Sequence, residues 1–310
     1  MAKYKIIVNP TAGKGAAGRL IPQINEKLKN YGLGYDLVCT EHPWHAADLA
    51  QQAIVAGYET IVAVGGDGTA NEVLNGIMIA KSAGLGSASM GILPVGRGND
   101  LAYGMGIPVN LDASLATLAE GNKCWMDIGC ISGGLYPQGR YFGNGVGIGF
   151  DTIVGFIAAE LKLTGFAAYL VAALKTMILY YNSPLLEIQY DHQSLTQKCI
   201  MVSLMNGKRM GGGFMMAPQS KPNDGFLDLC IASHINQFQV LMLIPRFIKG
   251  TQKGHPAISF KQAAHINIQA IEGSLPVHAD GETICTHGKE VTLKLLPRQI
   301  EFVTAYQESQ

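Results

Sequence analysis

The segment 65–69, with the sequence GGDGT, has the composition of a phosphate-binding turn. It directly follows the apolar residues 61–64 and directly precedes a helical pattern that begins at Ala70. Glycines let a ligand approach the backbone, their N–H groups and the start of the following helix favour phosphate, and Asp67 can orient Mg²⁺ through water. A tight turn with Thr69 as the helix N-cap is the alternative. An acid among three glycines after a buried strand favours phosphate binding.

Two other turns have related compositions. Residues 9–15, NPTAGKG, offer backbone donors and Lys14 to a phosphate, although Val8 and Gly15 stand where a Walker A loop has its first glycine and its Ser or Thr. Taken alone, this segment is explained equally well as a plain Pro/Gly turn. Residues 94–100, PVGRGND, also follow an apolar run and lead into a helical pattern. Three such turns on one rim of a sheet indicate a shared site rather than mere connections.

The elements that must position these turns follow from the pattern of the first third of the chain. Segments 4–8, 35–39, 60–64 and 90–93 have the apolar character of buried strands, and a polar or glycine-rich turn and a helical pattern follow each of them. This alternation predicts a parallel α/β sheet. Ligands bind beyond the carboxyl ends of such strands, which is where the turns lie.

The rest of the chain predicts a mostly antiparallel β domain. Its strand-like segments are 141–149, 185–190, 200–205, 226–232, 265–270, 291–295 and 300–304. Only 152–180 and 237–247 have a helical pattern there. We therefore expect an α/β domain at residues 1–128, on which residues 298–310 pack back, and a β-sandwich domain at residues 129–297.

Composition and charge narrow the class of protein. The 310 residues suit two domains, and 48% hydrophobic against 15% charged residues suits a large core with buried strands. Lys plus Arg and Asp plus Glu both number 23, so no global field attracts nucleic acid, and we expect no nucleic-acid partner. The six scattered cysteines form no metal-finger spacing. With no signal-peptide core and no uninterrupted apolar span, we expect a cytoplasmic protein.

Taken together, the motifs make this sequence similar to the diacylglycerol kinase catalytic-domain family, which includes sphingosine and ceramide kinases and is distantly related to NAD kinases. The matching segments are NPTAGKG at 9–15, HA at 45–46, GGDGT at 65–69, NE at 71–72, GRGND at 96–100, FGNGVGIGFD at 142–151, NGKRMGGGF at 206–214, NDGFLD at 223–228 and DGE at 280–282. The resemblance covers nearly the whole chain. Arg97 stands where the family commonly has Thr, and Asn223 stands where it often has Asp.

The resemblance implies a lipid kinase of phospholipid biosynthesis that transfers the γ-phosphate of Mg-ATP to a hydroxyl of a lipid such as diacylglycerol. ATP is then the co-substrate and Mg²⁺ the cofactor. The residues expected to bind the nucleotide are Asn9, Gly13, Lys14, Thr40, Gly66, Asp67, Gly68, Thr69, Glu72 and Arg97. A structural Mg²⁺ site is also implied, with the Asp224 carboxylate and the main-chain carbonyls of Lys221 and Phe226 as ligands. An Asx-type turn at Asp224 is the alternative.

The DGE segment resembles the position of the family's catalytic acid. Glu282 is our choice for the base that accepts the proton of the lipid hydroxyl, and Asp280 is its nearest rival. Asp67 could share the task, because the GGDG acid of sphingosine kinases is implicated in activating the substrate. Asp280 and Glu282 would project to the same side of a strand if both were extended. A hairpin turn at 280–281 is compatible with these roles.

The region Phe238 to His255 predicts reversible contact with the inner membrane surface. Its apolar residues are Phe238, Val240, Leu241, Leu243, Ile244, Phe247 and Ile248. Arg246, Lys249 and Lys253 cluster beside them, as in helices that lie on anionic membranes. A core helix with a solvated basic end is the alternative. The sequence is also compatible with a homodimer.

Two other functions stay open. A soluble NAD kinase would share the GGDG turn and the Asn-Glu pair, but the segments 206–214 and 223–228 resemble the lipid kinases instead. A catalytically inactive lipid-binding regulatory protein would keep the fold without the chemistry. The intact acids argue against that second alternative; they are Asp67, Asp224, Asp280 and Glu282.

Overall fold

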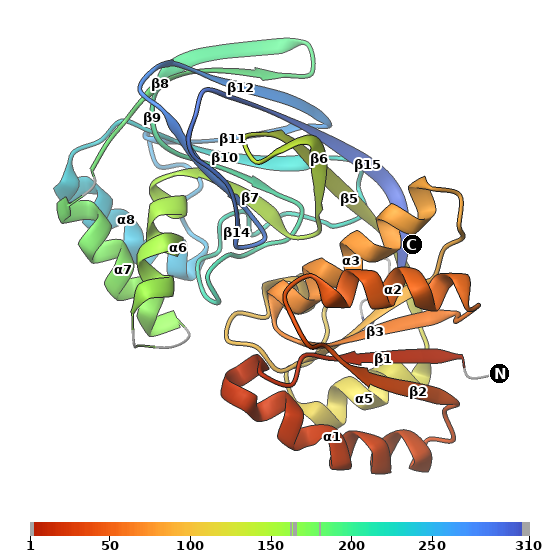
Figure 1. The fold of residues 1–310 in the computed structure, drawn as a ribbon. Coiled ribbons are helices and arrows are strands. Elements are labelled where there is room, and N and C mark those ends of the chain that lie inside the picture. Colours follow the sequence, from red (N-terminus) through yellow and green to blue (C-terminus); the bar gives the residue numbers. More distant parts are fainter. Residues whose placement is uncertain (1–2, 162, 164–165, 180, 306–310) are drawn as a thin grey trace. The chain divides into compact units, whose positions relative to one another are not determined.

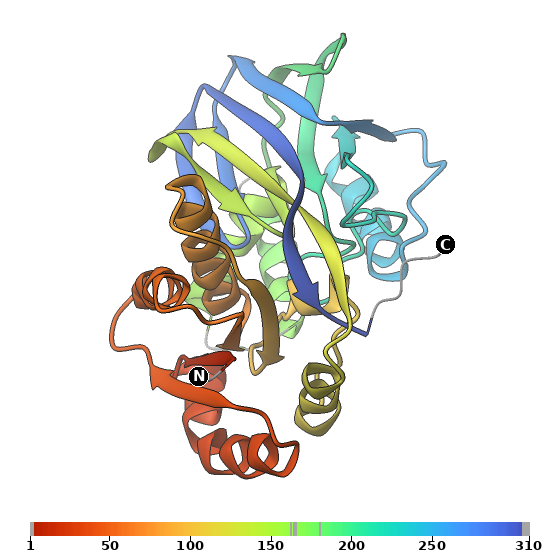
Figure 2. The same ribbon diagram turned by 90° about the vertical axis from the view of Figure 1, so that its right-hand side faces the viewer.

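The computed structural model describes residues 3–305 except 162, 164, 165 and 180. The chain divides into two compact units, one formed by Met1–Asp127 with Pro297–Gln310 and the other by Ile128–Leu296 (Figure 1). Strands β5 (Lys123–Gly133) and β15 (Glu290–Val303) have residues in both units. They pair with each other, and Figure 2 shows them side by side in yellow and blue.

A parallel sheet forms the centre of the first unit, with the strand order β4–β3–β1–β2. The strands are β1 (Tyr4–Val8), β2 (Tyr35–Cys39), β3 (Thr60–Gly65) and β4 (Ser89–Pro94). Phe302 of β15 adds a parallel pairing to Met90 of β4. All residues of β3 and β4 are buried, as expected for strands covered on both faces. The predicted parallel α/β fold of this part is confirmed.

Helices cover both faces of this sheet. They are α1 (Ala12–Asn30), α2 (His45–Val55), α3 (Asp67–Ser82), α4 (Asp100–Gly104) and α5 (Leu111–Glu120). In Figure 1, α2 and α3 lie on one face, and α1 and α5 lie on the other. Ile24 of α1 and Leu115 of α5 share one core cluster with Val62 of β3. The α2–α3 contact is close enough that a Cβ on Gly76 would lie 2.4 Å from the Ala47 carbonyl oxygen.

The strand order fixes where ligands can bind in the first unit. The connection after β1 leads to β2 on one side, and the next connection crosses back over β1 to β3. The turns that follow β1 and β3 therefore leave the sheet at its topological switch point. A crevice for ligands forms at such a point in open α/β sheets.

The second unit is an antiparallel β-sandwich. One layer has the order β6–β5–β15–β12–β8–β9, and the other has the order β14–β13–β7–β9–β10–β11. The strands not yet bounded are β6 (Tyr136–Phe142), β7 (Gly145–Gly149), β8 (Leu185–Tyr190), β9 (Gln193–Met205), β10 (Leu227–Ser233), β11 (Ile258–Ala263), β12 (His265–Glu272), β13 (Leu275–Ala279) and β14 (Glu282–Gly288). The first half of β9 pairs with β8 and its second half with β7 and β10, so this strand joins the layers.

Three helices cover the outer face of the β7–β9–β10 layer. They are α6 (Phe150–Glu160), α7 (Phe166–Leu179) and α8 (Gln237–Lys249). Val202 of β9 belongs to the core between the sheets, whereas its neighbour Met201 belongs to the core cluster that includes Leu243 and Phe247 of α8. This alternation is what the pleat of a strand requires. The predicted β-sandwich is confirmed, with a helical layer on one side. Among the described helices, none has the length and apolar content needed to span a bilayer.

Several predicted elements differ from the observed ones. The segment 141–149, expected as one strand, is divided between β6 and β7, because the N–H groups of residues 143–145 bind the Asp280 carboxylate. The two strands expected at 291–295 and 300–304 are parts of the single strand β15, and β5 and β11 were not predicted. The long helical pattern at 152–180 is two helices, and some of its residues lie outside the described ones.

Candidate active site

The turns after β3 and β4 touch at the rim of the first unit. The Val95 N–H donates to the Gly65 carbonyl over 2.8 Å. A Cβ on Gly96 would lie 2.4 Å from the Cα of Gly66, so no side chain fits between the two backbones. The GGDGT and GRGND segments are therefore brought together, and their glycines are required by this approach.

The turn after β1 joins the same place. The Asn9 side-chain amide donates to the Thr69 hydroxyl oxygen over 3.1 Å. A Cβ on Gly13 would lie 2.5 Å from the Val95 carbonyl oxygen. The three turns that the sequence singled out thus meet at the switch point, and they bring Asn9, Gly13, Gly66 and Thr69 into one region of the first unit.

Three consecutive residues of the first turn have left-handed backbone conformations. Gly13, Lys14 and Gly15 have φ values of 60°, 58° and 82°. Residues other than glycine rarely adopt this conformation, because it costs conformational energy. Such strained residues cluster at functional sites, so the conformation of Lys14 makes this turn a candidate site. The Gly15 N–H donates to the Thr11 carbonyl over 3.0 Å and so closes the turn. The exposed Lys14 side chain adds a positive charge to it.

Two carboxylates approach each other across the GRGND turn. A Cβ on Gly98 would lie 2.8 Å from Asp67 Oδ2 and 3.3 Å from Asp100 Oδ2. Asp67 Oδ1 accepts from the Leu101 N–H over 3.2 Å, which fixes the carboxylate at the start of α4. Asp100 was not among the predicted site residues, although it ends the same motif. Two neighbouring carboxylates are a donor set that suits a hard cation such as Mg²⁺.

Two hydrogen bonds stabilise the turn that precedes Asp100. Asn99 has φ 54°, and its side chain both accepts from the Gly96 N–H over 2.9 Å and donates to the Gly96 carbonyl over 3.1 Å. Arg97, between them, is exposed. The structure thus places Arg97 on the rim beside the turn of Gly66, where its guanidinium is accessible to a ligand.

Glu72 and Thr40 have more local contacts. Glu72 Oε2 accepts from the Ala46 N–H over 3.1 Å, and Ala46 lies in the first turn of α2. This explains the joint presence of the His-Ala and Asn-Glu segments, since one carboxylate satisfies an N–H at the start of the neighbouring helix. The Thr40 N–H donates to the Val8 carbonyl over 2.8 Å, which places Thr40 at the end of β2 beside Asn9.

In the second unit, Asp280 lies in the turn between β13 and β14. Its φ is 48° and that of Gly281 is 88°, as in a two-residue hairpin turn. Its carboxylate accepts from the N–H groups of Gly143, Asn144 and Gly145 over 2.8, 3.0 and 2.9 Å. The hairpin turn considered for 280–281 is thus present, and the condition that both Asp280 and Glu282 be extended is not met.

Glu282 is the first residue of β14, and its side chain is exposed. No described residue lies within hydrogen-bonding distance of its carboxylate. The two acids of the DGE segment therefore differ. One binds three backbone groups of a distant turn, and the other presents its carboxylate to solvent.

The predicted metal segment forms an Asx-type turn. Asp224 Oδ1 accepts from the Phe226 N–H over 3.1 Å, as the alternative interpretation required. Close by, Asp228 Oδ2 is buried without a hydrogen-bond partner among the described residues. Burial raises the pKa of Asp228, with a smaller contribution from the Asp224 charge. Hydrogen bonds oppose this rise, and their partners are Gln219, Ser220 and Gln262. A buried, unpartnered carboxylate oxygen beside a second carboxylate fits a cation, although no described cluster contains three or more His, Cys, Asp or Glu side chains.

A polar cluster that the sequence did not indicate lies across strands β13, β7 and β9. His278, Gly147 and Ser203 pair in register and share one sheet face. Asp151 Oδ2 accepts from the Ser203 hydroxyl over 2.7 Å. A Cβ on Gly147 would lie 2.4 Å from His278 Nε2 and 2.6 Å from Asp151 Oδ2. Burial raises the pKa of Asp151 to about 7 and lowers the pKa of His278 to about 4.

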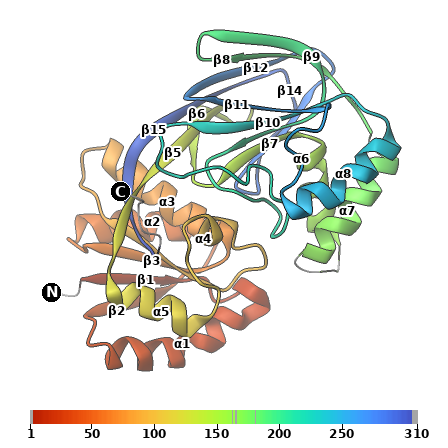
Figure 3. The same ribbon diagram turned by 180° about the vertical axis from the view of Figure 1, so that it is seen from behind.

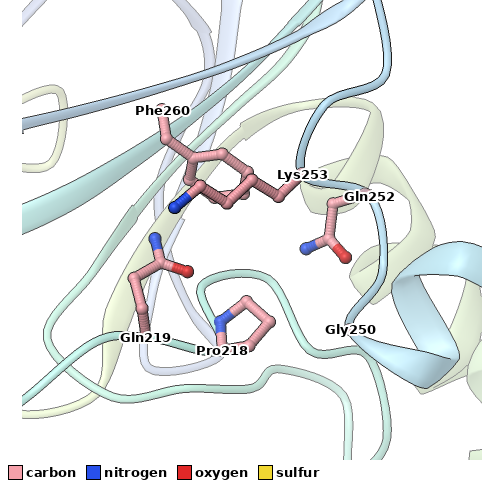
Figure 4. A pocket seen from close by; sticks show the side chains of 6 residues that line it. All are labelled: Pro218, Gln219, Gly250, Gln252, Lys253 and Phe260. Carbon is pink, nitrogen blue, oxygen red and sulfur yellow. The ribbon is translucent and has the colours of Figure 1, made fainter.

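A pocket of about 310 Å³ lies elsewhere on the second unit. Its lining residues are Pro218, Gln219, Gly250, Gln252, Lys253 and Phe260 (Figure 4). None of the predicted site residues lines it. Gln219 in its lining donates its side-chain amide to Asp228 Oδ1 over 3.3 Å. The pocket therefore adds nothing to the nucleotide or base positions.

Comparison with known families shows which family models match the segments that carry these motifs. Residues 3–131 match the family model described as diacylglycerol kinase catalytic domain. Residues 144–304 match the model described as YegS C-terminal NAD kinase beta sandwich-like domain. The chain belongs to the diacylglycerol kinase catalytic-domain family. The turns at 9–15, 65–69 and 96–100 all fall within the first match, and the DGE segment falls within the second.

Individual members of the diacylglycerol kinase family resemble the chain over most of its length. The diacylglycerol kinase of Staphylococcus saprophyticus is 28% identical over 282 residues, which cover 90% of this chain and 88% of the relative. That of Staphylococcus aureus strain Newman is 29% identical, with 90% of this chain and 86% of the relative covered. These relatives support a kinase of the lipid kinase type.

Solved structures show the same fold. A diacylglycerol kinase from Bacillus anthracis str. Sterne has a TM-score of 0.75 at 21% identity, covering 97% of this chain and 96% of that one. An NAD kinase from Archaeoglobus fulgidus in complex with ATP has a TM-score of 0.54 at 14% identity, covering 97% and 93%. The fold of the diacylglycerol kinase family is thus also the fold of an NAD kinase.

Proposed function

We propose that this protein is an ATP- and Mg²⁺-dependent lipid kinase that phosphorylates a lipid hydroxyl, with diacylglycerol as the first candidate acceptor. The observation that carries the proposal is the meeting of three glycine-rich turns at the switch point of the parallel sheet, with Asp67 and Asp100 around Gly98. Membership of the diacylglycerol kinase family supports the acceptor class. The product would be a phosphorylated lipid, an intermediate of phospholipid metabolism.

The nucleotide is assigned to the rim of the first unit. The left-handed backbone at 13–15 and the Lys14 ammonium suit the phosphates of ATP. Asn9, Thr40, Glu72 and Arg97 complete the proposed set with the glycines of the second turn, Gly66 and Gly68, and with Thr69. The Glu72 carboxylate contributes by fixing the start of α2, since it caps that helix. Phosphoryl transfer depends mainly on positioning and charge neutralisation, which is what such a rim supplies.

Two cation positions follow from the carboxylates. Asp67 and Asp100 would hold the Mg²⁺ that accompanies the triphosphate, where the ion supplies neutralisation of the phosphate charge. A second, structural Mg²⁺ would be held by Asp224 with the main-chain carbonyls of Lys221 and Phe226. The buried oxygen of Asp228 supports that second site, because a neighbouring cation would compensate its desolvation.

Glu282 is the proposed base. In the reaction the acceptor hydroxyl oxygen forms a bond to the γ-phosphorus, the bond from that phosphorus to the β–γ bridging oxygen breaks, and ADP leaves with the bond's electrons. The hydroxyl proton passes to the Glu282 carboxylate, late in a loose transition state. The exposed carboxylate of Glu282 supports this role, since no described residue competes for it.

Asp280 is proposed as a positioning residue. Its carboxylate ties the turn before Glu282 to residues 143–145, and so fixes the start of β14. Asp67 is assigned to binding the phosphates and the cation rather than to the role of base. One of its oxygens accepts from the Leu101 N–H, and the other lies near Gly98 and Asp100. A lipid acceptor also implies a cytoplasmic protein that binds reversibly to the inner surface of the membrane.

A transfer assay with radiolabelled ATP tests the proposal. Diacylglycerol, monoacylglycerol, ceramide and sphingosine are offered in mixed micelles, with NAD as a soluble acceptor, at fixed Mg²⁺. We expect transfer to at least one lipid and none to NAD. Asp67→Asn should lower kcat by roughly 10²-fold or more with the fold intact, because the amide keeps the shape and loses the charge.

The other outcomes separate the alternatives. Transfer to NAD without transfer to any lipid would establish the NAD kinase alternative. ATP binding without transfer to any acceptor would favour the regulatory protein. If Asp67→Asn kept full activity, the proposed role of the GGDGT turn in binding the phosphates would be wrong.

A further inference from the structure

Two helices of the second unit form an outer surface that no described element covers. The Gln237 side chain at the start of α8 donates to the Met177 carbonyl near the end of α7 over 3.0 Å. Figures 1 and 3 both show α7 and α8 side by side at one end of this unit. The residues that follow the two bonded ones, Ile178 on α7 and Phe238 on α8, are both exposed.

The outer face of this helix pair is apolar. Ile178, Phe238 and Met242 expose 68%, 70% and 60% of their surfaces. Leu174 and Leu241 are also exposed. We call these five residues the apolar patch. Exposed groupings of large apolar side chains mark sites of interaction with a membrane or another protein.

The opposite face of α8 belongs to the core. Val240, Leu243 and Phe247 pack against the sheet, and Ile244 packs against α6 and α7. Four of the seven apolar residues in the predicted membrane segment are therefore buried, and the expectation that all of them face an interface is wrong. The available surface comes instead from α8 together with α7, which was not expected to take part.

Four basic residues lie on these two helices or just after α8. Arg246 and Lys249 occupy the last turn of α8, Lys253 follows it, and Lys175 is on α7, all with exposed side chains. Neither helix contains an Asp or Glu. Within α8 the exposed face changes from apolar in its first turns to basic in its last, which is the pattern of a helix lying at an anionic interface.

We propose that the α7–α8 face is the membrane-binding surface, with the apolar patch entering the headgroup boundary and the four cations contacting anionic headgroups. Charge complementarity selects this partner. A second copy of the chain on a two-fold axis would bring the same cations together and repel itself. The biological role of this surface rests on the proposed lipid kinase function. Binding of the protein to vesicles can nevertheless be measured without catalysis.

Vesicle sedimentation in the absence of ATP and acceptor tests the surface. Vesicles of phosphatidylcholine alone are compared with vesicles containing about one third phosphatidylglycerol. We expect the protein to bind the anionic vesicles and to release with added salt. Each basic residue near an anionic surface contributes roughly fivefold, so Arg246→Gln/Lys249→Gln/Lys253→Gln should weaken binding by about 100-fold.

The apolar contribution is tested separately. Ile178→Ser/Phe238→Ser/Met242→Ser should weaken binding to anionic vesicles by roughly 10³-fold, because each of the three inserted side chains contributes about tenfold. The matched control is Val109→Ser/Leu135→Ser/Ile271→Ser, which changes three similarly exposed apolar residues elsewhere. The control should bind like the wild type. Circular dichroism melts establish that each variant is folded.

Contrary outcomes are distinct. Equal binding by the wild type and both α7–α8 variants, or no binding to anionic vesicles at all, would overturn the proposal. If the apolar variant changed the oligomeric state but not vesicle binding, the surface would be a contact between copies. Activity toward a short-chain acceptor dispersed without a bilayer reports on the kinase alone, so a failed surface and a failed function are separable.

Discussion

At the level of single side chains, the two acids of the DGE segment have opposite environments. Asp280 accepts three backbone hydrogen bonds within 3.0 Å, and Glu282 is exposed. A carboxylate with three N–H donors is stabilised in its charged form, which suits a structural role better than proton transfer. The residue identities alone could not distinguish the two, because the difference depends on a turn 135 or more positions away.

Conservative substitutions at these two acids should give different results. We expect Glu282→Gln to lower kcat by roughly 10²-fold or more with an unchanged melting temperature, since only the proton acceptor is lost. Asp280→Asn should lower stability by about 1–3 kcal/mol, because its NH₂ group must face a backbone donor. Steady-state kinetics and thermal melts of both variants test this. If Asp280→Asn were inactive but as stable as the wild type, Asp280 would be the base and Glu282 the positioning residue.

The Asp151–His278 cluster makes a prediction for the dependence of stability on pH. The pKa of Asp151 is raised to about 7, so the folded state keeps a proton that the unfolded state loses, and this stabilisation is lost as the pH rises from about 4 to 7. The pKa of His278 is lowered from 6.5 to about 4, so stability falls as the pH drops through that window. The two effects oppose each other in the wild type.

Single variants should separate the two contributions. In Asp151→Asn the remaining His278 should make the melting temperature fall, relative to the wild type, as the pH is lowered from 6.5 to 4. In His278→Gln the remaining Asp151 should make it fall as the pH is raised from about 4 to 7. Thermal melts at closely spaced pH values measure both. Parallel profiles for the three proteins would show that these groups are not perturbed by burial.

At the level of elements, the start of α2 depends on a side chain of α3. Trp44 at the N-cap of α2 has φ 70° and makes no side-chain capping bond, and Glu72 supplies the missing acceptor for the Ala46 N–H. Glu72 was expected as a nucleotide residue, and its observed contact is with a helix terminus. A carboxylate there satisfies an otherwise unpaired donor and interacts favourably with the helix dipole.

We therefore predict that Glu72→Ala destabilises the protein by about 1 kcal/mol, which is typical for the loss of a helix cap. Glu72→Gln keeps an acceptor oxygen, so it should lose only part of this stability. Denaturant unfolding measures the stability, and ATP binding is measured in parallel. If Glu72→Ala bound ATP poorly with unchanged stability, the direct nucleotide role would be correct instead.

At the level of the whole molecule, the proposed structural cation should couple metal binding to folding. Excess Mg²⁺ should raise the melting temperature of the wild type, since a ligand at 100 times its Kd stabilises by about 2.7 kcal/mol. Asp224→Ala should show little of this shift, and Asp228→Asn, which keeps the shape of the unpartnered side chain, should show a reduced one. Calorimetry with and without Mg²⁺ tests this. An identical shift in all three proteins would place the metal elsewhere.

The sequence by itself determined the features that short segments encode. Apolar runs followed by glycine-rich turns predicted the parallel strands, because burial on both faces and close backbone approach restrict which residues can occur there. The GGDGT, NPTAGKG and GRGND turns were assigned to one rim on the same grounds, and their contacts through Gly13, Gly66 and Gly96 fit that assignment.

Only the tertiary structure decided which distant groups meet. The contact of Asp280 with Gly145, the approach of Asp67 and Asp100 across Gly98, and the row of His278 and Ser203 beside Asp151 all arise from strand register and turn packing. The same holds for the face of α8 that stays exposed. Local patterns could not predict these, because hydrogen-bond partners far apart in sequence are fixed by the assembled core rather than by neighbouring residues.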